Sequence, residues 1–273
     1  MNTVTRMKPL YYRSIWISDV HLGSKECKAE YLLDFLSSTR CDNLYLVGDI
    51  IDIWSYKRNR YWSQAHSNVI NLLLEKARTG TRVVYVPGNH DEDFRKYCGS
   101  LFGNVELHRR FVHETADGRR FLMLHGDEFD HLIHCGRLLS LVGDVSYEFL
   151  IRLNRWVNIG RRLFGRPYWS LSSYIKTRVK KARQHIDNFE QAATEEARRL
   201  DMDGVICGHI HHADLSMNEG VLYCNDGDWV ENCTAVVESH EGWLEILHWA
   251  DQRKTMKVCG VNGEVEIPAT AAA

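Results

Sequence analysis

The stretch Gly208-His209-Ile210-His211-His212 lies late in the chain and decides how the rest of it is interpreted. It follows a short apolar run, Gly204–Cys207, that predicts a strand. In an extended segment residues i and i+2 point the same way, so His209 and His211 can present two imidazoles to one place. Imidazole is an ordinary metal ligand. Alone, the stretch is a histidine cluster that fits several roles, and its interpretation depends on similar stretches elsewhere in the chain.

Four earlier stretches end apolar, β-prone runs in the same way. They are Asp19-Val20-His21, Gly48-Asp49, Gly88-Asn89-His90-Asp91 and His125-Gly126-Asp127. Strands are predicted before them over 13–18, 43–47, 82–86 and 120–124, with helices over 29–36 and 65–78 and late strands over 221–224, 234–238 and 243–249. This alternation predicts an α/β fold with parallel strands. Ligands bind beyond the carboxyl ends of such strands, so the five stretches should converge on one crevice.

The residue types in these stretches suit two divalent metal ions. Asp and His are common ligands of Mn, Fe and Zn. The two oxygens of a carboxylate such as Asp49 can bridge two cations, whereas the Asn89 carbonyl is a weaker, neutral ligand. Two ions about 3.5–4 Å apart can hold a hydroxide and both ends of an in-line displacement at phosphorus. Each stretch alone also fits a structural role, since Gly-Asp after a strand is commonly a turn, but the five in this order favour catalysis.

Composition fits one α/β domain with an insertion, or two small domains, because the chain has 273 residues and is 44% hydrophobic. A net charge of −2 gives no overall argument for a nucleic-acid partner. Eight scattered cysteines without a Cys-x-x-Cys fit reduced thiols. No run approaches the ~20 apolar residues of a membrane span, and the first ten residues lack the apolar core of a secretory signal. We therefore expect a cytoplasmic protein.

The segment 130–200 differs from the rest of the chain, because it is helical in pattern and strongly basic. Between Arg137 and Arg183 there are eleven basic residues and two acidic ones, with aromatic side chains among them. We interpret 130–200 as a helical cap inserted into a domain that spans 10–250, and 251–273 as a flexible tail. Three roles stay open for the cap: a solvated face, a holder of an anionic amphiphile, or a peripheral contact with the inner membrane surface.

These motifs resemble those of the calcineurin-like metallophosphoesterase superfamily, from about Ile15 to about Trp249. They appear here as Asp19-x-His21, Gly48-Asp49-x-x-Asp52, Gly88-Asn89-His90-Asp91, His125-Gly126 and Gly208-His209-x-His211. The resemblance implies a four-layer α-β-β-α sandwich with the helical cap inserted. It also implies two sets of ligands with Asp49 bridging the metals: Asp19, His21 and His211 for one ion, and Asn89, His125 and His209 for the other.

The same resemblance gives catalytic roles to two residues beside the metals. His90 would lie next to the scissile group as an electrostatic or proton-donating partner. Asp52, the second acid of its motif, would orient His90. A carboxylate paired with an imidazole favours the imidazolium form, which suits a general acid for a leaving oxygen.

Within the superfamily, the chain is most similar to the family of UDP-2,3-diacylglucosamine pyrophosphohydrolases. The similar features are Ser18-Asp19-Val20-His21-Leu22, Leu124-His125-Gly126-Asp127, the basic insertion and the chain length. That family uses manganese and forms UMP and 2,3-diacylglucosamine 1-phosphate in lipid A biosynthesis. The resemblance thus implies a lipid-linked nucleotide substrate and two Mn²⁺ ions, although Fe or Zn would suit the same ligands. Its phosphate-binding cap residues would correspond to Lys176, Lys180 and Lys181.

One motif departs from that family, which has Gly-Asn-Arg-Asp where this chain has Gly88-Asn89-His90-Asp91. The family's Arg is expected to contact substrate, and His90 with Asp52 looks more like the general phosphoesterase arrangement. Two alternatives to the lipid-linked substrate therefore remain: a general phosphodiesterase or phosphatase, and a metal-free interaction module on the same fold. A nuclease is disfavoured, because the chain is nearly neutral and has no appended DNA-binding domain.

Overall fold

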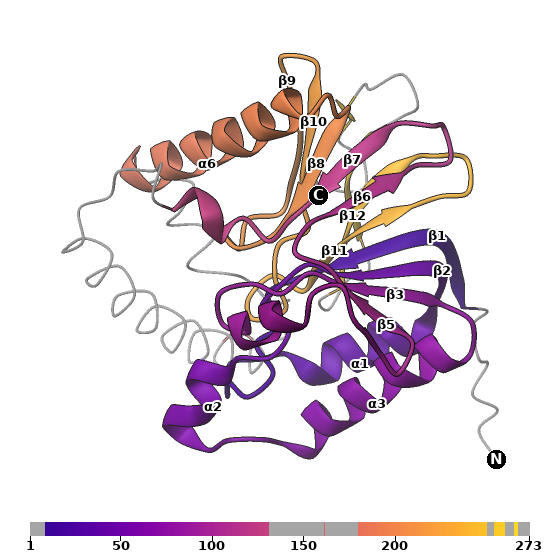
Figure 1. Cartoon of the computed structure of the whole chain (residues 1–273), viewed down its shortest axis with the longest axis vertical. Coiled ribbons are helices and arrows are strands. Elements are labelled where there is room, and N and C mark those ends of the chain that lie inside the picture. Colours follow the sequence, from indigo (N-terminus) through magenta and orange to yellow (C-terminus); the bar gives the residue numbers. More distant parts are fainter. Residues whose placement is uncertain (1–8, 131–160, 162–179, 250–253, 260–264, 267–273) are drawn as a thin grey trace.

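The computed structural model describes residues 9–130, 161, 180–249, 254–259 and 265–266, and in it two β-sheets lie face to face (Figure 1). The larger sheet has the order β14-β13-β12-β11-β1-β2-β3-β5-β4 and the smaller one the order β6-β7-β8-β10-β9. Strands of the larger sheet are β1 (Leu10–Ile17), β2 (Thr39–Leu46), β3 (Arg82–Tyr85), β4 (Leu101–Phe102), β5 (Val105–Leu107), β11 (Thr234–Glu238), β12 (Leu244–His248), β13 (Lys254–Cys259) and β14 (Val265–Glu266). Those of the smaller sheet are β6 (Phe111–Glu114), β7 (Arg120–Met123), β8 (Gly204–Cys207), β9 (Asp214–Asn218) and β10 (Val221–Asn225).

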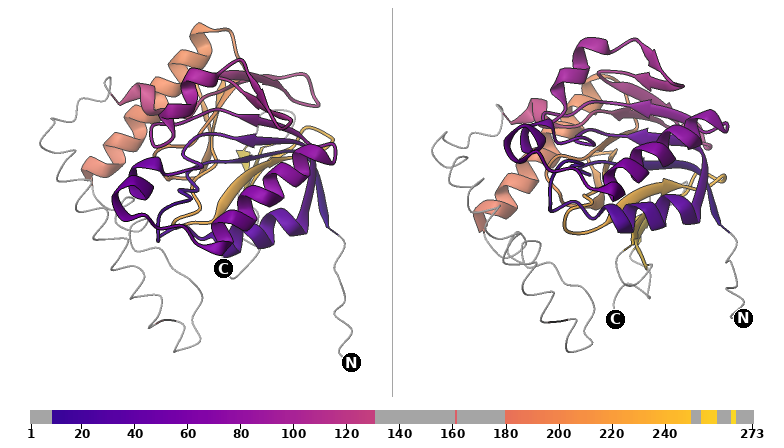
Figure 2. Two further views of the ribbon diagram at one scale, coloured as in Figure 1. Left: turned by 60° about the horizontal axis from the view of Figure 1, so that its bottom comes forward. Right: turned by 90° about the horizontal axis from the view of Figure 1, so that it is seen from below.

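Helices cover the outer faces of both sheets. Helices α1 (Ala29–Ser38) and α3 (Gln64–Arg78) lie side by side on the larger sheet, and α6 (Lys180–Arg199) lies on the smaller one (Figures 1 and 2). A short helix, α2 (Ile53–Asn59), and two 3₁₀ turns, η1 (Glu92–Tyr97) and η2 (Asp127–Phe129), lie in the loops that follow β2, β3 and β7.

Alternation along the strands builds three apolar layers. In β1, Ile15 and Ile17 pack against the helices of the larger sheet, whereas Trp16 packs between the sheets. In β7, Phe121 packs between the sheets and Leu122 packs on the side of α6. The predicted four-layer α-β-β-α sandwich is therefore confirmed.

Parallel pairing brings the polar stretches to one edge. Strands β1, β2, β3 and β5 are parallel to their neighbours in that order, and β7, β8 and β10 are parallel in the smaller sheet. The carboxyl ends of β1, β2 and β3 therefore share one edge of the larger sheet, and those of β7 and β8 share one edge of the smaller sheet. The polar stretches that follow these strands gather where the two edges approach each other, as the hydrogen bond from the His209 N–H to Asp19 Oδ2 shows.

Two segments behave differently from the sequence interpretation. Helix α6 lies within the predicted cap 130–200, but its Phe189, Ala193 and Ala197 are fully buried against the smaller sheet, so this helix forms the fourth layer of the sandwich. Within the predicted tail 251–273, β13 pairs antiparallel with β12 and β14 pairs with β13. Residues 131–160 and 162–179 of the predicted cap, Lys176 among them, lie outside the described residues. Lys180 and Lys181 begin α6, and their side chains also lie outside the described part.

Among the described residues, no helix is both long enough and apolar enough to cross a membrane.

Candidate metal centre

The loops that follow β1 and β2 run side by side, which brings the first two motifs together. The backbone N–H of Asp19 donates to Gly48 O at 3.0 Å, and that of His21 donates to Asp49 O at 2.9 Å. The Asp52 N–H closes the pairing by donating to Leu22 O at 2.8 Å. Local backbone hydrogen bonds thus place these carboxylates and the His21 imidazole within a few residues of one another.

Several predicted ligands have a strained backbone. Ten described residues other than glycine have a positive φ, and five of them are predicted metal ligands: Asp19 (49°), His21 (54°), Asp49 (53°), His209 (70°) and His211 (51°). Each such conformation costs on the order of 1–3 kcal/mol and persists only where the surrounding structure fixes it. The fold therefore holds these side chains in place at the expense of local stability.

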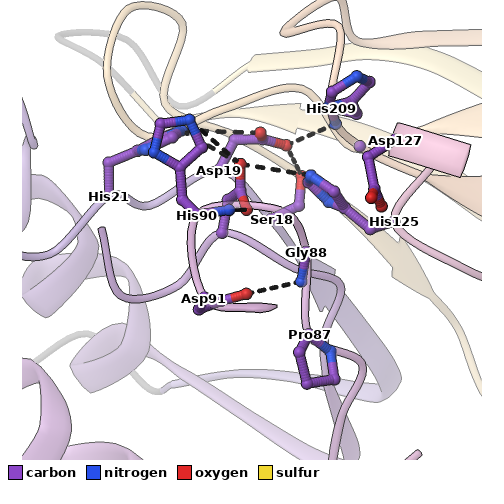
Figure 3. Close-up of polar contacts among 12 residues, drawn as sticks. Ser18, Asp19, His21, Pro87, Gly88, His90, Asp91, His125, Asp127 and His209 are labelled. Carbon is purple, nitrogen blue, oxygen red and sulfur yellow. Dashed lines mark hydrogen bonds and ion pairs between the residues drawn. The ribbon is translucent and has the colours of Figure 1, made fainter. Parts of the chain in front are cut away.

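The ligand atoms converge around Asp49 and Asp19. Figure 3 shows Asp19 and His21 from the loop after β1, His90 from the loop after β3 and His125 from the loop after β7 reaching the same region. Asp49 Oδ2 lies 3.3 Å from His125 Nε2 and 3.9 Å from His21 Nε2. Asp19 Oδ1 lies 3.2 Å from His211 Nε2 and 3.8 Å from His21 Nε2. Asp49 thus lies between the histidines, where a carboxylate can bridge two ions.

Four buried polar atoms of the predicted metal ligands have no hydrogen-bond partner among the described residues. They are Asp19 Oδ1, His21 Nε2, Asn89 Oδ1 and His125 Nε2. A buried polar atom left unsatisfied costs about 1–3 kcal/mol, so four together are exceptional. Divalent ions would satisfy all four atoms, and the donor set of carboxylate, imidazole and amide oxygen suits Mn, Fe or Zn. The residues present therefore fit metal binding.

The other polar atoms of these ligands are held by the protein. His125 Nδ1 donates to Val47 O at 2.8 Å, and His21 Nδ1 donates to Asp52 Oδ2 at 3.2 Å. Such contacts fix the tautomer and orientation of an imidazole, so each ring turns its Nε2 toward the centre.

Charge at the site favours cations. Burial would raise the pKa of Asp49, but the His125 and His21 imidazoles outweigh burial and hold that pKa well below its usual range. Burial would lower the pKa of His125, but the Asp49 carboxylate outweighs it and raises the pKa to about 10. The field that binds protons here would also attract a divalent ion, and metal binding would release those protons.

His90 and Asp52 form the predicted pair. His90 Nδ1 lies 3.0 Å from Asp52 Oδ1, and His90 Nε2 lies 4.0 Å from Asp49 Oδ2. The His90 ring is 4.6 Å from the His21 ring, edge-on, and 4.4 Å from the Trp54 ring of α2. The Asp52 carboxylate also caps α2 by accepting from the Ser55 N–H. Asp52 therefore orients His21 as well as His90, a double role that the sequence does not indicate.

His209 is placed differently from the other predicted ligands. Its backbone N–H donates to Asp19 Oδ2 at 2.8 Å, but its Nε2 donates to Asp130 Oδ1, also at 2.8 Å. It is absent from the groups of described His and acidic residues whose ligand atoms lie within 4.8 Å of one another. Its ring stays close to that of His125, with 5.1 Å between the centroids.

Two buried carboxylates that sequence reasoning did not assign hold the loops together. Asp91 accepts hydrogen bonds from the N–H groups of Ile50 and Gly88 and from the Tyr85 hydroxyl, so it joins the loops after β2 and β3. Asp226 contacts Ser18 Oγ, which in turn contacts the Asp19 carboxylate. Asp91 stands within a quoted motif, but nothing local in the sequence indicates these distant partners.

Comparison with known proteins supports the interpretation of this site as a phosphoesterase metal centre. The family described as Calcineurin-like phosphoesterase matches residues 12–213. The chain therefore belongs to this family and is a metal-dependent phosphoester hydrolase.

Its curated relatives include the UDP-2,3-diacylglucosamine hydrolase of Haemophilus influenzae (strain PittGG), 25% identical over 253 residues that cover 84% of this chain and 95% of the relative. The enzyme of the same name from Blochmanniella pennsylvanica (strain BPEN) is 25% identical over 212 residues, which cover 72% of this chain and 78% of the relative. Among solved structures, Yfce, a phosphoesterase from E. coli, superposes with a TM-score of 0.49 at 15% identity, covering 91% of this chain and 99% of that one.

Gly208→Ala should disrupt the centre through Asp19. A Cβ at this position would overlap Ser18 Oγ and Asp19 Oδ2, and overpacking of this kind costs about 1–3 kcal/mol. We expect a lower Tm together with weaker metal binding, measured by thermal unfolding and by metal analysis of the purified protein. Gly80→Ala is the control for a loss of stability away from the centre: its Cβ would meet no atom within 4 Å, but its φ of +108° strains an alanine, so its Tm should fall while its metal content stays unchanged. Full metal content in Gly208→Ala would contradict the packing argument.

Proposed function

We propose that the chain is a binuclear-metal phosphohydrolase that attacks a phosphoester or pyrophosphate. One ion would be held by Asp19, His21 and His211, the other by Asn89, His125 and His209, with Asp49 between them. The observation that carries the proposal is the set of four buried, unpartnered ligand atoms, of which those of His21 and His125 lie 3.9 and 3.3 Å from Asp49 Oδ2. The loops at the strand ends also hold carboxylate oxygens and imidazole nitrogens close together. Asp19 Oδ1 lies 3.2 Å from His211 Nε2, and Asp49 Oδ2 lies 3.9 Å from His21 Nε2, which supports the same conclusion.

The proposed metal ions, His90 and Asp52 would have different roles in hydrolysis. Two divalent ions, when bound, supply an activated hydroxide at neutral pH and positive charge that offsets the phosphoryl group. His90 is partly exposed at the edge of the centre, with 26% of its side chain accessible, so its Nε2 can reach a phosphoryl or leaving oxygen. Asp52 beside Nδ1 orients the ring for this contact. His90 would therefore act as an electrostatic partner or general acid, with Asp52 as its positioning residue.

The substrate we propose is a lipid-linked nucleotide diphosphate, converted to UMP and 2,3-diacylglucosamine 1-phosphate in lipid A biosynthesis. The support is the similarity to proteins named UDP-2,3-diacylglucosamine hydrolase, one of which this chain covers over 95% of its length. Mn²⁺ would be the metal. The basic insertion, with Lys176, Lys180 and Lys181, would bind the phosphates, and a peripheral position on the inner face of the membrane would bring the enzyme to its lipid.

A second candidate is a phosphodiesterase or phosphatase that acts on soluble substrates. The 3.0 Å contact between His90 and Asp52 favours it, because His90 stands where the resemblance to the lipid A enzymes implies an Arg. Turnover of UDP-2,3-diacylglucosamine should be compared with that of nitrophenyl phosphate esters, with Mn²⁺ present in both assays. Release of UMP supports the first substrate, whereas turnover of the simple esters alone supports the second.

Metal binding should raise thermal stability as well as activity. A ligand that binds only the folded state adds about 2.7 kcal/mol at 100 times its Kd. Because about 1 kcal/mol shifts Tm by roughly 2–4 °C at this size, each ion should raise Tm by roughly 5–10 °C. Thermal unfolding of chelator-treated protein, with and without added Mn²⁺, measures the effect. An unchanged Tm with no bound Mn, Fe or Zn would instead support the metal-free interaction module.

A further inference from the structure

Asp130 contacts a predicted ligand from a position that the catalytic proposal does not use. Its Oδ1 accepts a hydrogen bond from His209 Nε2 at 2.8 Å. The Asp130 side chain is 55% exposed and that of His209 only 16%, so the pair lies at the rim of the centre. The His209 ring is bounded on its other sides by the rings of His125, at 5.1 Å, and Phe189, at 6.0 Å.

We infer that Asp130 is a positioning residue that fixes His209 for the ion shared with Asn89 and His125; this inference rests on the proposed binuclear function. A carboxylate that accepts from one imidazole nitrogen fixes the tautomer and leaves the other nitrogen for a metal. With Nε2 committed to Asp130, Nδ1 is the nitrogen of His209 that is available. His125 has the mirror arrangement, since its Nδ1 is held by Val47 O and its Nε2 is unpartnered.

The segment that carries Asp130 is itself firmly attached. Asp127, in η2, accepts two hydrogen bonds from Arg95 Nη2 at 2.7 and 2.8 Å, and Arg95 Nε also donates to Pro87 O, next to the loop that carries Asn89. Phe129 is buried and its ring meets that of Phe189 in α6 at 5.8 Å. Figure 3 shows Asp127, His125 and His209 grouped on this side of the site. The anchored turn therefore presents Asp130 to His209 at a fixed position.

This placement distinguishes the two proposed ions. Among the contacts of the described residues, Asp130 pairs with His209 of the proposed ligands, whereas His21 contacts Asp52 and His211 contacts Asp19. A partly exposed ion pair contributes little to folding stability, so removing Asp130 should leave the sandwich intact. Removal of the Asp130 carboxylate should therefore lower the Mn²⁺ affinity selectively at the position formed by Asn89, His125 and His209.

The experiment is a Mn²⁺ titration of the metal-depleted full chain by calorimetry, with the spin-coupled signal of a Mn pair as a second readout. Partners of metal-bound histidines contribute roughly 10–100-fold in affinity. Asp130→Ala should therefore weaken one of two Mn²⁺ affinities by roughly that factor and leave the other unchanged. The Mn²⁺ affinity of Asp130→Asn should lie between those of Asp130→Ala and the unmodified chain, because the amide oxygen can still accept a hydrogen bond from His209 Nε2. Saturating Mn²⁺ should restore the spin-coupled pair and turnover in both variants.

Asp42→Ala is the matched control, because Asp42 Oδ2 forms a similar half-exposed pair with His240 Nε2 at 3.1 Å, outside the centre. It should leave both Mn²⁺ affinities unchanged. Two unchanged affinities in Asp130→Ala, or an equal loss of both, would overturn the role of Asp130. Binding of fewer than two ions by the unmodified chain would instead overturn the proposed binuclear function.

Discussion

Asp49→Asn should lower kcat by roughly three orders of magnitude with the fold intact. Asp49 Oδ1 accepts a hydrogen bond from the backbone N–H of His90 at 2.8 Å, whereas Asp49 Oδ2 faces the imidazoles of His125 and His21. Asn has nearly the same shape and can keep the first contact, but it removes the negative charge between the two proposed ions. Bound metal ions stabilise the charge of the transition state by several kcal/mol. Losing that stabilisation should lower kcat by roughly 10³-fold, at about 1.4 kcal/mol per tenfold change in rate.

The measurement is kcat at saturating substrate and Mn²⁺, with bound metal quantified on the same sample. Asp93→Asn is the control, since Asp93 is half-exposed in η1 and pairs with Lys57 at 3.3 Å. That variant should keep full activity. If Asp49→Asn kept its activity within a factor of about ten and bound two ions, Asp49 would not be the bridging ligand.

The strands that carry the motifs could be predicted from the sequence because parallel strands are buried on both faces. In β3, Val83, Val84 and Tyr85 are all buried, and the run in β8 from Gly204 to Cys207 is buried throughout. Such continuous apolar runs bounded by glycine are strong local signals. The ligands stand just beyond them, so the convergence of Asp19, Asp49 and His125 followed from topology.

Other elements depend on tertiary pairing that has no local signal. Strand β9 is a mostly polar segment, and it forms because it pairs with β10 along its whole length. Strand β13 lies in a weakly patterned part of the chain and is added to the sheet by β12. For α6, the basic charges suggested a cap, but Phe189, Ala193 and Ala197 recur every four residues and mark a buried helix face. Weighing that spacing against the charge would have identified the fourth layer.

Within the site, the sequence indicates ligands better than it indicates their supports. Motif residues are recognisable because their types and order are local. Their supports, Val47 O for His125 and Asp130 for His209, are separated from them by 78 and 79 residues. One is a backbone carbonyl, which any residue could supply, so no residue type reveals it. Supports of this kind emerge only once the loops are assembled.

His90→Gln should separate substrates by their leaving groups. A general acid contributes about 10²–10⁴-fold where the leaving oxygen needs a proton, and much less where the leaving group is already stable as an anion. We expect kcat on an alkyl phosphodiester to fall by roughly 10²–10³-fold, and kcat on the matching nitrophenyl ester to fall by less than about tenfold. Glutamine keeps a polar side chain beside Asp52 and Trp54, so the metal content should not change.

Both esters should be assayed on the same preparation, so that misfolding cannot imitate the difference. His108→Gln is the matched control, because His108 Nε2 pairs with Glu106 at 3.2 Å, away from the centre. Asp52→Asn should show the same leaving-group dependence and, since Asp52 also holds His21 Nδ1 at 3.2 Å, should weaken metal binding as well. An equal loss of kcat on both esters in His90→Gln would mean that His90 stabilises phosphoryl charge and transfers no proton. The leaving-group dependence therefore distinguishes proton transfer by His90 from electrostatic stabilisation of the phosphoryl group.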